Sequence, residues 1–171
     1  MEKITTLYER DEAQRGRPVK PGLKSSCTWV EAGEGLATRK LDGTNVKVER
    51  GALWKRQKPA EGDYDNAAYV PARRDDPADR YLFEAFDAQE EWTDGIYEAV
   101  GPKIQGNPER YERHTLVRVV PVDPSLILQD APRTFESLRD YLSMNGIEGI
   151  VFHHPDGRKA KIKKRDFGLR R

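Results

Sequence analysis

Apolar residues in this chain recur mostly with a period of two, which limits the folds open to it. The alternation is clearest in four short stretches, VKV, IYEAV, LVRVV and GIVF. Successive side chains of a strand point to opposite faces of a sheet, so this pattern predicts strands with one buried face. We therefore expect a protein dominated by β-sheet, with helices as a minor component.

Two segments show a helical period instead. The first spans residues 77–92, and we expect Asp75 or Asp76 to cap its N-terminus. Its core-facing residues are predicted to be Leu82, Ala85 and Phe86. The stretch 59–79 is rich in Pro, Asp, Gly and Arg, which predicts a long surface loop.

The second helical segment spans residues 135–144. Thr134 is the expected N-terminal cap, and the pair Asn145 and Gly146 is expected to end the helix. The residues predicted to face the core are Phe135, Leu138 and Leu142.

Length and composition favour one globular domain spanning residues 1–171. The chain is 35% charged and 36% hydrophobic. Its aromatic and β-branched content is too high for a disordered chain, and its length suffices for a two-layer core. The single cysteine, Cys27, excludes internal disulfides and any zinc site built on several cysteines.

Charge and apolar runs bear on partners and location. The formal net charge is only +1, yet the last fourteen residues hold eight Lys or Arg and one Asp. Such a basic end is a candidate contact for a polyanion. No apolar run approaches the length of a membrane span. We expect a soluble, cytoplasmic protein that does not enter a membrane.

Residues 147–164 predict an antiparallel hairpin, because two apolar alternations flank the turn signal PDG. Lys161 and Lys163 then share one face of a strand. The plainest interpretation is a solvent-exposed hairpin with cross-strand ion pairs, which stabilise a fold only weakly. The alternative is a pair of lysines that faces an anionic ligand.

The loop of this hairpin decides what faces the lysines. A two-residue loop at positions 155–156 would pair Glu148 with Lys163. A three-residue loop with a bulge at Gly157 would shift the register by one residue and separate the acid from the lysines. The sequence leaves both registers open.

The stretch ATRKLDGTNVKV, residues 37–48, places a lysine, an acid and a glycine just before a strand-like alternation. One interpretation is a hairpin turn that carries a solvated Lys40. The other is a nucleophilic Lys40. That role requires the neutral amine, and hence partial burial or nearby cations such as Lys161 and Lys163. Asp42 would share the face of Lys40 if the segment is extended.

Four segments in order resemble the motifs of the covalent nucleotidyltransferases, the family of RNA ligases, DNA ligases and mRNA capping enzymes. KLDGTN matches the first motif, Lys-x-Asp-Gly, and YEAVG is similar to the strand with the ribose-binding glutamate. EGIVF resembles the fourth motif, and KIK matches the Lys-x-Lys of the fifth. The resemblance covers residues 40–165. LWKRQKP, EGIVFHHPDG and the closing DFGL are most similar to the RNA ligase 1 group.

This resemblance implies an α+β nucleotidyltransferase domain, ATP-grasp-like, with antiparallel sheets flanked by helices and the nucleotide between the sheets. It also implies a monomeric, ATP-dependent RNA ligase that uses Mg²⁺ or Mn²⁺. Lys40 would attack the α-phosphate of ATP and hold AMP. The AMP would pass to an RNA 5′-phosphate, which a 3′-hydroxyl end would then attack to seal the strand.

The same resemblance implies roles for individual residues. Lys40 is the nucleophile, and Lys161 and Lys163 neutralise the α-phosphate. Glu148 holds the hydrated metal ion, and Asp42 helps to position Lys40 and the water shell of the metal. The remaining nucleotide contacts are implied for three residues, Asn45, Arg56 and Glu98.

Two features depart from the family pattern. The aromatic residue that stacks on adenine has no counterpart in RHTLVRVVP, where His114 or an aliphatic residue would replace it. Only seven residues follow Lys164, so we expect a minimal catalytic domain without an OB domain. The alternatives are a DNA ligase, a capping-like guanylyltransferase and a non-catalytic module that binds nucleic acid.

Overall fold

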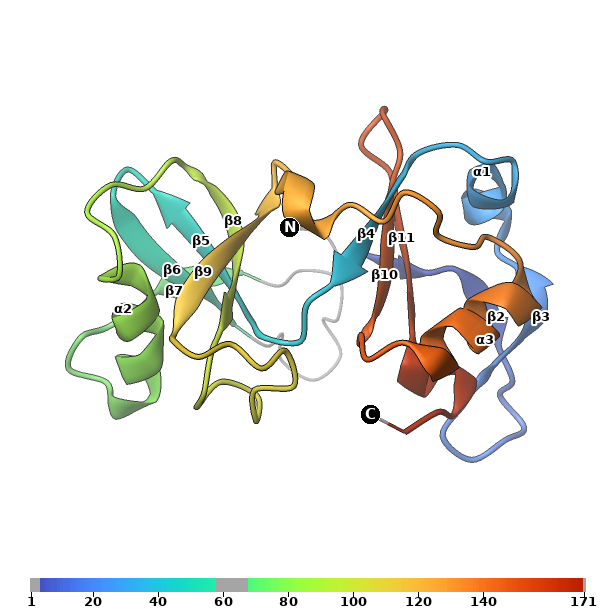
Figure 1. Cartoon of the computed structure of the whole chain (residues 1–171), viewed down its shortest axis with the longest axis horizontal. Helices are drawn as coiled ribbons and strands as arrows, with labels where there is room; N and C mark the ends of the chain where they lie inside the picture. Colours follow the sequence, from blue (N-terminus) through green and yellow to red (C-terminus); the bar gives the residue numbers. More distant parts are fainter. Residues whose placement is uncertain (1–3, 58–67, 171) are drawn as a thin grey trace. The chain divides into compact units, whose positions relative to one another are not determined.

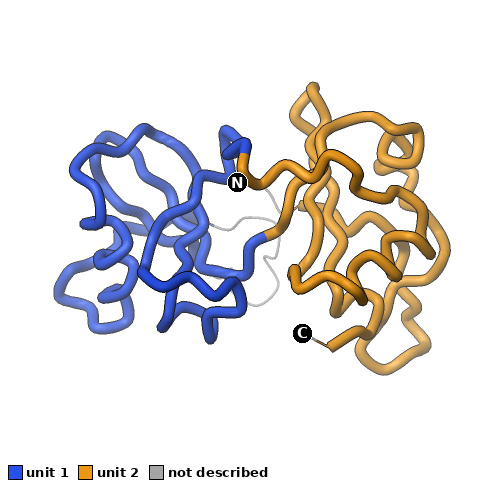
Figure 2. Tube along the Cα trace, in the orientation of Figure 1, with its two compact units in different colours: residues 1–3, 41–124 blue, residues 4–40, 125–171 orange. Residues whose placement is uncertain are grey.

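The computed structural model describes residues 4–57 and 68–170, which form two compact units (Figure 2). Unit 1 comprises Leu41–Pro124. Unit 2 comprises Ile4–Lys40 and the C-terminal segment that begins at Ser125. Each unit has its own sheet and its own hydrophobic core.

Unit 1 is built on a five-stranded antiparallel sheet with the strand order β7-β6-β5-β8-β9 (Figure 1). Its elements are β5 (Thr44–Glu49), β6 (Ala52–Arg56), β7 (Tyr69–Pro71), the 3-10 helix η2 (Pro77–Asp79), α2 (Arg80–Phe86), β8 (Gly95–Val100) and β9 (Thr115–Val120). Alternate residues of the strands share one core with residues of α2: Val46, Val48, Tyr97, Ala99, Leu82 and Ala85. The polar residues Asn45, Lys47 and Glu98 lie on the other face of the sheet.

The prediction of a helix at residues 77–92 is confirmed at its start and wrong at its end. The Asp76 carboxylate caps η2 and accepts a hydrogen bond from the Ala78 N–H at 2.9 Å. The helix ends at Phe86, because Trp92 folds back onto it. The Trp92 indole N–H donates to the Phe86 carbonyl at 2.8 Å, and the two rings stack with centroids 5.8 Å apart. The indole thus supplies a partner for a carbonyl near the end of the helix.

The surface loop predicted at residues 59–79 is also only partly right. Tyr69–Pro71 form the edge strand β7, and their backbone pairs with β6. Pro77–Asp79 form η2. Composition predicted a loop here, but the backbone of β7 is satisfied by pairing with β6. Residues 59–67 of this prediction lie outside the described residues.

Unit 2 is built on a four-stranded sheet with the order β1-β11-β10-β4, and β2 and β3 form a second, two-stranded sheet. The strands are β1 (Thr5–Thr6), β2 (Tyr8–Arg10), β3 (Val19–Leu23), β4 (Leu36–Lys40), β10 (Gly149–His153) and β11 (Lys159–Lys163). The helical elements are η1 (Ser25–Cys27), α1 (Thr28–Glu31), α3 (Phe135–Met144) and η4 (Lys164–Phe167), while η3 (Pro124–Leu126) spans the boundary of the units. Residues of α3 and of the sheet share one core: Leu138, Leu142, Ala37, Ile150, Phe152, Ala160 and Ile162.

Helix α3 confirms the prediction for residues 135–144. Leu138 and Leu142 are fully buried, as the apolar period indicates. Thr134 occupies the N-cap position, although its hydroxyl contacts the Ser137 hydroxyl instead of a backbone N–H. The helix stops at Asn145, which has an extended backbone.

The hairpin predicted at residues 147–164 is confirmed, and its register is that of the longer loop. Gly149 pairs with Lys163, and Gly157 takes the left-handed conformation with φ of 94°. Gly149, and not Glu148, therefore lies opposite Lys163.

The architecture is α+β, with two main sheets and a few short helices. Strand pairs are antiparallel, as predicted, except that β1 runs parallel to β11. Within residues 4–57 and 68–170, no helix has the length and apolar character needed to cross a membrane.

Candidate functional site

One end of the unit 2 sheet brings together residues from three separate motifs. Gly149 begins the central strand β10 and pairs with Lys40 on one side and with Lys163 on the other. Directly paired residues point to the same face, so the two lysines flank a position that has no side chain. Lys161 lies opposite Val151, two residues further along and on the same face.

Lys40 contacts an acid that the sequence placed in a different motif. Its amine forms an ion pair with the carboxylate of Glu148, and the two side chains are 25% and 14% exposed. The Glu148 carbonyl accepts a hydrogen bond from the Lys164 N–H at 2.9 Å, which fixes the backbone just before β10. The charges of Glu148 and Lys40 also act on the buried Lys163, so the three side chains form one cluster of two amines and a carboxylate.

The interpretation of Lys40 as part of a hairpin turn is wrong. Strand β4 pairs with β10, whereas β5 pairs with β6 and β8. The strand also ends at Lys40, so its alternation does not continue to Asp42. Lys40 thus ends a strand that pairs with β10, far away in the sequence, where it lies opposite Gly149.

The Lys163 amine has an unusual electrostatic environment. The residue is only 7% exposed, and burial lowers the pKa of its amine. The carboxylates of Asp166 and Glu148 oppose that shift, and the positive charges of Arg165 and Lys40 add to it. A buried ammonium is costly unless an anion compensates it, so this position favours a negatively charged ligand.

Asp166 anchors the end of β11 and was not singled out from the sequence. The Lys163 N–H donates to Asp166 Oδ2 at 3.0 Å. The Arg10 guanidinium donates to Asp166 Oδ1 at 2.7 Å, and the aspartate is 2% exposed. Asp166 is the first residue of the DFGL stretch, which could have drawn attention to it. Asp166 fixes the backbone that carries Lys163.

Unit 1 brings together three other predicted residues on the polar face of its sheet. Strand register pairs Asn45 with Glu98 and Arg56 with Tyr69. The Asn45 amide donates to Glu98 Oε2 at 3.2 Å, and the Tyr69 hydroxyl donates to Asn45 Oδ1 at 2.5 Å. Burial raises the pKa of Tyr69, and the positive charge of Arg56 opposes that shift. Asn45, Arg56 and Glu98 thus share one cluster.

Tyr69 is the member of this cluster that sequence reasoning missed. It lies at the start of β7, inside the stretch predicted to be a loop. The pair Tyr69 and Val70 has high β-propensity, and this signal could have indicated a strand. Its hydroxyl bond holds the Asn45 amide in the orientation that reaches Glu98.

Asp42 lies in a different unit from Lys40 and Glu148, and the chain passes from unit 2 to unit 1 at Leu41. Asp42 is 8% exposed, and its N–H donates to Glu109 Oε1 at 3.1 Å. Its predicted part in a metal site stays a prediction.

The candidate metal ligands can be tested against the donor atoms present. Among the described residues, no three His, Cys, Asp or Glu side chains gather as a metal site. Mg²⁺ usually keeps several waters and takes only one or two protein carboxylates. Glu148 is a half-buried carboxylate at the edge of a cluster that favours anions, so it fits a hydrated Mg²⁺ held together with phosphate oxygens.

His114, predicted as one replacement for the adenine-stacking aromatic, already packs within unit 1. Its ring stacks on Tyr81 with centroids 4.9 Å apart. Its Nδ1 lies 2.9 Å from Glu84 Oε2, and its Nε2 accepts a hydrogen bond from the Lys103 N–H at 3.2 Å. One face and both nitrogens of the imidazole are therefore occupied by the protein.

His153 lies on the same face as the lysines and is held neutral. Burial lowers its pKa to about 4, and the charge of Lys159 adds to the shift. The Thr38 hydroxyl donates to the Val151 carbonyl at 3.2 Å and lies 2.9 Å from His153 Nε2. Because that hydroxyl proton is already used, Nε2 carries the ring proton and donates to the Thr38 oxygen.

We expect the protein to lose stability as the pH falls from about 6.5 to about 4. Over this range His153 takes up a proton in the unfolded chain but not in the folded one, so acid favours unfolding. His153→Gln keeps a donor near Thr38 and removes the titration. Urea unfolding of both proteins across this range measures the difference. Equal pH dependence for the two proteins would contradict the expected neutral state of His153.

Comparisons with known proteins give a similarity of limited strength. No protein-family model matches the sequence, and no curated protein matches it. Among solved structures, the chain is similar to the apo form of a lysine-to-alanine mutant of RNA ligase R4a from Naegleria gruberi, with 17% sequence identity and a TM-score of 0.44. The match covers 98% of this chain and 62% of that one, so this chain spans less than two thirds of the ligase. Likeness at this level assigns neither a family nor an activity to the chain.

Proposed function

We propose that this chain is an ATP-dependent RNA ligase that forms a covalent nucleotide on Lys40. The observation that carries the proposal is the meeting of Lys40, Glu148 and Lys163 at one end of three neighbouring strands. These residues come from three motifs that resemble the nucleotidyltransferase family. We propose that residues 1–171 act as one nucleotidyltransferase domain built from the two units, as a cytoplasmic monomer.

In the first step Lys40 is the nucleophile. Its Nζ attacks the α-phosphorus of ATP, an N–P bond forms, the bond from that phosphorus to the bridging oxygen breaks, and pyrophosphate leaves. The ammonium loses one proton to solvent before the attack and a second as the N–P bond forms, and the nitrogen keeps one N–H. Lys161 and Lys163 lie on the same face and stabilise the charge on the α-phosphate oxygens.

Glu148 and Asp42 are the proposed metal residues. A Mg²⁺ or Mn²⁺ ion, when bound, supplies positive charge that neutralises and orients the phosphates. Glu148 would hold the hydrated ion, and Asp42 would help to position its water shell. Without the ion, the carboxylate of Glu148 keeps the Lys40 side chain in place through their ion pair.

The unit 1 cluster is the proposed site for the ribose and phosphates. Glu98 accepts hydrogen bonds from the ribose hydroxyls, while Asn45 holds one of its oxygens. Arg56 offers the planar fork of donors that suits phosphate oxygens. Tyr69 supports Asn45 from the edge strand. The fixed hydrogen bonds of this cluster favour a ligand that meets it in one orientation.

The remaining steps move AMP onto RNA and then release it. The 5′-phosphate of an RNA end attacks the phosphorus held by Lys40, the N–P bond breaks, and a 5′–5′ pyrophosphate linkage forms. The 3′-hydroxyl of the second end attacks the 5′-phosphorus of the activated end. A phosphodiester forms, AMP leaves, and the strand is sealed.

The proposal is tested by supplying the protein with matched nucleotides and strands. We expect label from α-labelled ATP, but not from GTP, to remain on the denatured protein in the presence of Mg²⁺. We also expect RNA ends to be joined in preference to DNA ends of the same sequence. Label from GTP would indicate a guanylyltransferase, and equal joining of DNA would indicate a DNA ligase. RNA binding without covalent label from either nucleotide would indicate a non-catalytic module.

A further inference from the structure

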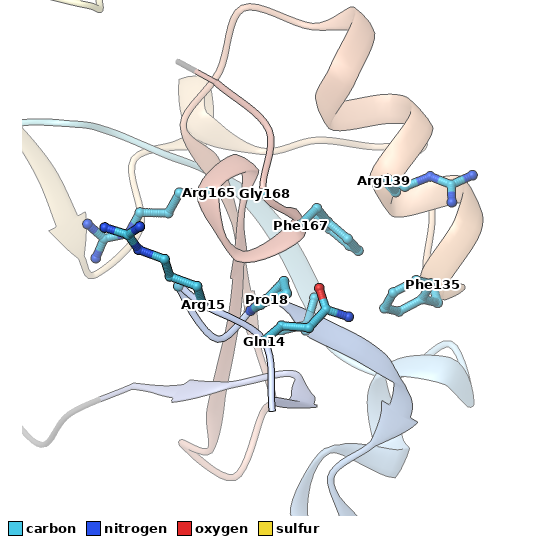
Figure 3. Close-up of a pocket in the computed structure, with 10 residues that line it drawn as sticks. Gln14, Arg15, Pro18, Phe135, Arg139, Arg165, Phe167 and Gly168 are labelled. Carbon is cyan, nitrogen blue, oxygen red and sulfur yellow. The ribbon is translucent and has the colours of Figure 1, made fainter. Parts of the chain in front are cut away.

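Unit 2 contains a cavity of about 490 Å³ that none of the eight proposed site residues lines (Figure 3). It is formed by the loop between β2 and β3, the first residues of α3, and η4. Its volume is within the range of roughly 300 to 1,000 Å³ that is typical of ligand pockets. The cavity is thus large enough for a nucleotide-sized group.

The charge of this cavity is of one sign. Its lining includes Arg15, Arg139 and Arg165, and among the described residues that line it there is no Asp or Glu. Arg139 pairs with Asp140, its exposed neighbour on α3. The side chains of Arg15 and Arg165 form no hydrogen bond or ion pair with other described residues. Two exposed guanidinium groups without a protein carboxylate favour an anion, and their planar forks suit phosphate oxygens.

The other side of the cavity is aromatic. Phe167 and Phe135 meet edge to face with centroids 5.1 Å apart, and Phe135 meets Tyr8 in the same way at 5.0 Å. Both phenylalanines are partly exposed, and in Figure 3 the Phe167 ring lies between Arg139 and the side chains of Arg15 and Arg165. Aromatic surfaces of this kind stack on nucleic-acid bases with little regard for sequence.

Both walls are held by hydrogen bonds before any ligand binds. The Arg10 guanidinium donates to the Arg17 carbonyl at 2.7 Å and to Asp166 at 2.7 Å, which links the β2–β3 loop to η4. The Arg17 N–H donates to the Gln14 carbonyl at 3.0 Å, which closes a turn around Arg15. Binding to such a site costs less ordering entropy than binding to a free loop.

We propose that this cavity binds one nucleotide of a single-stranded RNA, with a phosphate at Arg15 and Arg165 and its base against Phe167. Naming RNA as the ligand rests on the proposed function. The combination of two guanidinium groups and an aromatic wall in one cavity favours a nucleotide over an isolated phosphate, which needs no aromatic surface. The cavity is then an anchor for the substrate strand, separate from the residues that react with ATP.

Binding of a fluorescent 5′-phosphorylated oligoribonucleotide of about ten nucleotides, measured by anisotropy without ATP, tests this proposal. We expect Arg15→Gln and Arg165→Gln each to weaken binding about tenfold, because each loses a charge-assisted phosphate contact. Each should also lower the slope of log K against log salt by about 0.7. Phe167→Leu keeps an apolar contact with Phe135 and removes the flat ring, so we expect a loss of about fivefold.

Lys20→Gln is the matched control. Lys20 is exposed on β3 next to Val19, which lines the cavity, but its side chain points to the opposite face of the strand. Lys20→Gln removes the same charge as each arginine variant. Because Lys20 lies outside the cavity and salt screens an exposed charge, we expect less than a twofold effect on RNA binding. Thermal unfolding of every variant checks that the fold is retained.

Three results would overturn the proposal. The first is wild-type affinity in both arginine variants. The second is an equal loss in Lys20→Gln, which would indicate diffuse charge instead of a cavity. The third is displacement of the RNA by ATP in the wild type, which would assign the cavity to a free nucleotide. Self-labelling of the wild type with ATP, measured without RNA, tests the proposed ligase activity separately. If the wild type is not labelled but its RNA binding still depends on Arg15 and Arg165, the proposed ligase activity is rejected and the proposed RNA site in the cavity stands.

Discussion

Lys40→Ala is expected to abolish covalent labelling of the protein by α-labelled ATP, a loss of about a thousandfold or more. The alanine side chain has no nucleophilic nitrogen. The measurement is the label that stays on the denatured chain after incubation with Mg²⁺. A P–N bond is cleaved by acid and survives alkali, so these two treatments identify the linkage.

Two further variants separate the chemistry of Lys40 from its ion pair with Glu148. Lys40→Arg keeps the positive charge beside Glu148 but offers a guanidinium that stays protonated, so we expect no label and an unchanged fold. Lys159→Ala removes a half-buried lysine from the same face of β11, and we expect labelling to be retained.

The outcome that would contradict the role of Lys40 is specific. Burial lowers the pKa of the amines of Lys159 and Lys163, so either is more readily deprotonated than an exposed lysine. If Lys40→Ala is still labelled and the label maps to Lys159 or Lys163, the nucleophile is on β11. A lysine of β11 would then be the nucleophile in place of Lys40.

Gly149→Ala is expected to lower the free energy of unfolding by about 3 kcal/mol, at the upper end for overpacking. A Cβ at this position would lie 2.2 Å from the Ile162 carbonyl oxygen and 2.9 Å from the Lys163 Cα. Both atoms belong to the backbone of β11, so relief requires the two strands to separate. Because Gly149 also lies between Lys40 and Lys163, we expect labelling of the folded protein to fall as well.

Gly146→Ala is the control for this substitution. A Cβ on Gly146 meets no atom within 4 Å, so we expect a change within about 0.5 kcal/mol. Urea unfolding of the wild type and both variants measures the difference. Wild-type stability in Gly149→Ala would show that β10 and β11 can separate without cost. It would contradict the expectation that this position requires a glycine.

The local elements were largely predictable from the sequence. The alternation predicted the strands that carry Val46, Tyr97 and Ile150, and the apolar period predicted α3 with both of its boundaries. The shared face of Lys161 and Lys163 follows from the same alternation. These predictions succeed because burial of every second or every third to fourth side chain leaves a pattern within a few residues.

Predictions that depended on a distant partner were incomplete. The helix at residues 77–92 ends early because Trp92 returns to Phe86, and part of the predicted loop is a strand because Tyr69 pairs with Arg56. The register of the hairpin was open between two loops that differ by one residue. Each of these outcomes depends on a contact with another element, which the local sequence does not specify.

The candidate site was also predictable only in part. The sequence by itself determined that the chain is rich in strands and which motif residues to examine, because side-chain chemistry and periodicity are local properties. Only the tertiary structure decided that Lys40 meets Glu148, that Gly149 separates two lysines, and that Tyr69 and Asp166 support the clusters. The physical reason is that strand pairing brings Lys40 to Glu148, which is 108 positions away in the sequence. Hydrogen-bond ladders are alike for every strand, so the choice of partner is made by the packing of the whole fold.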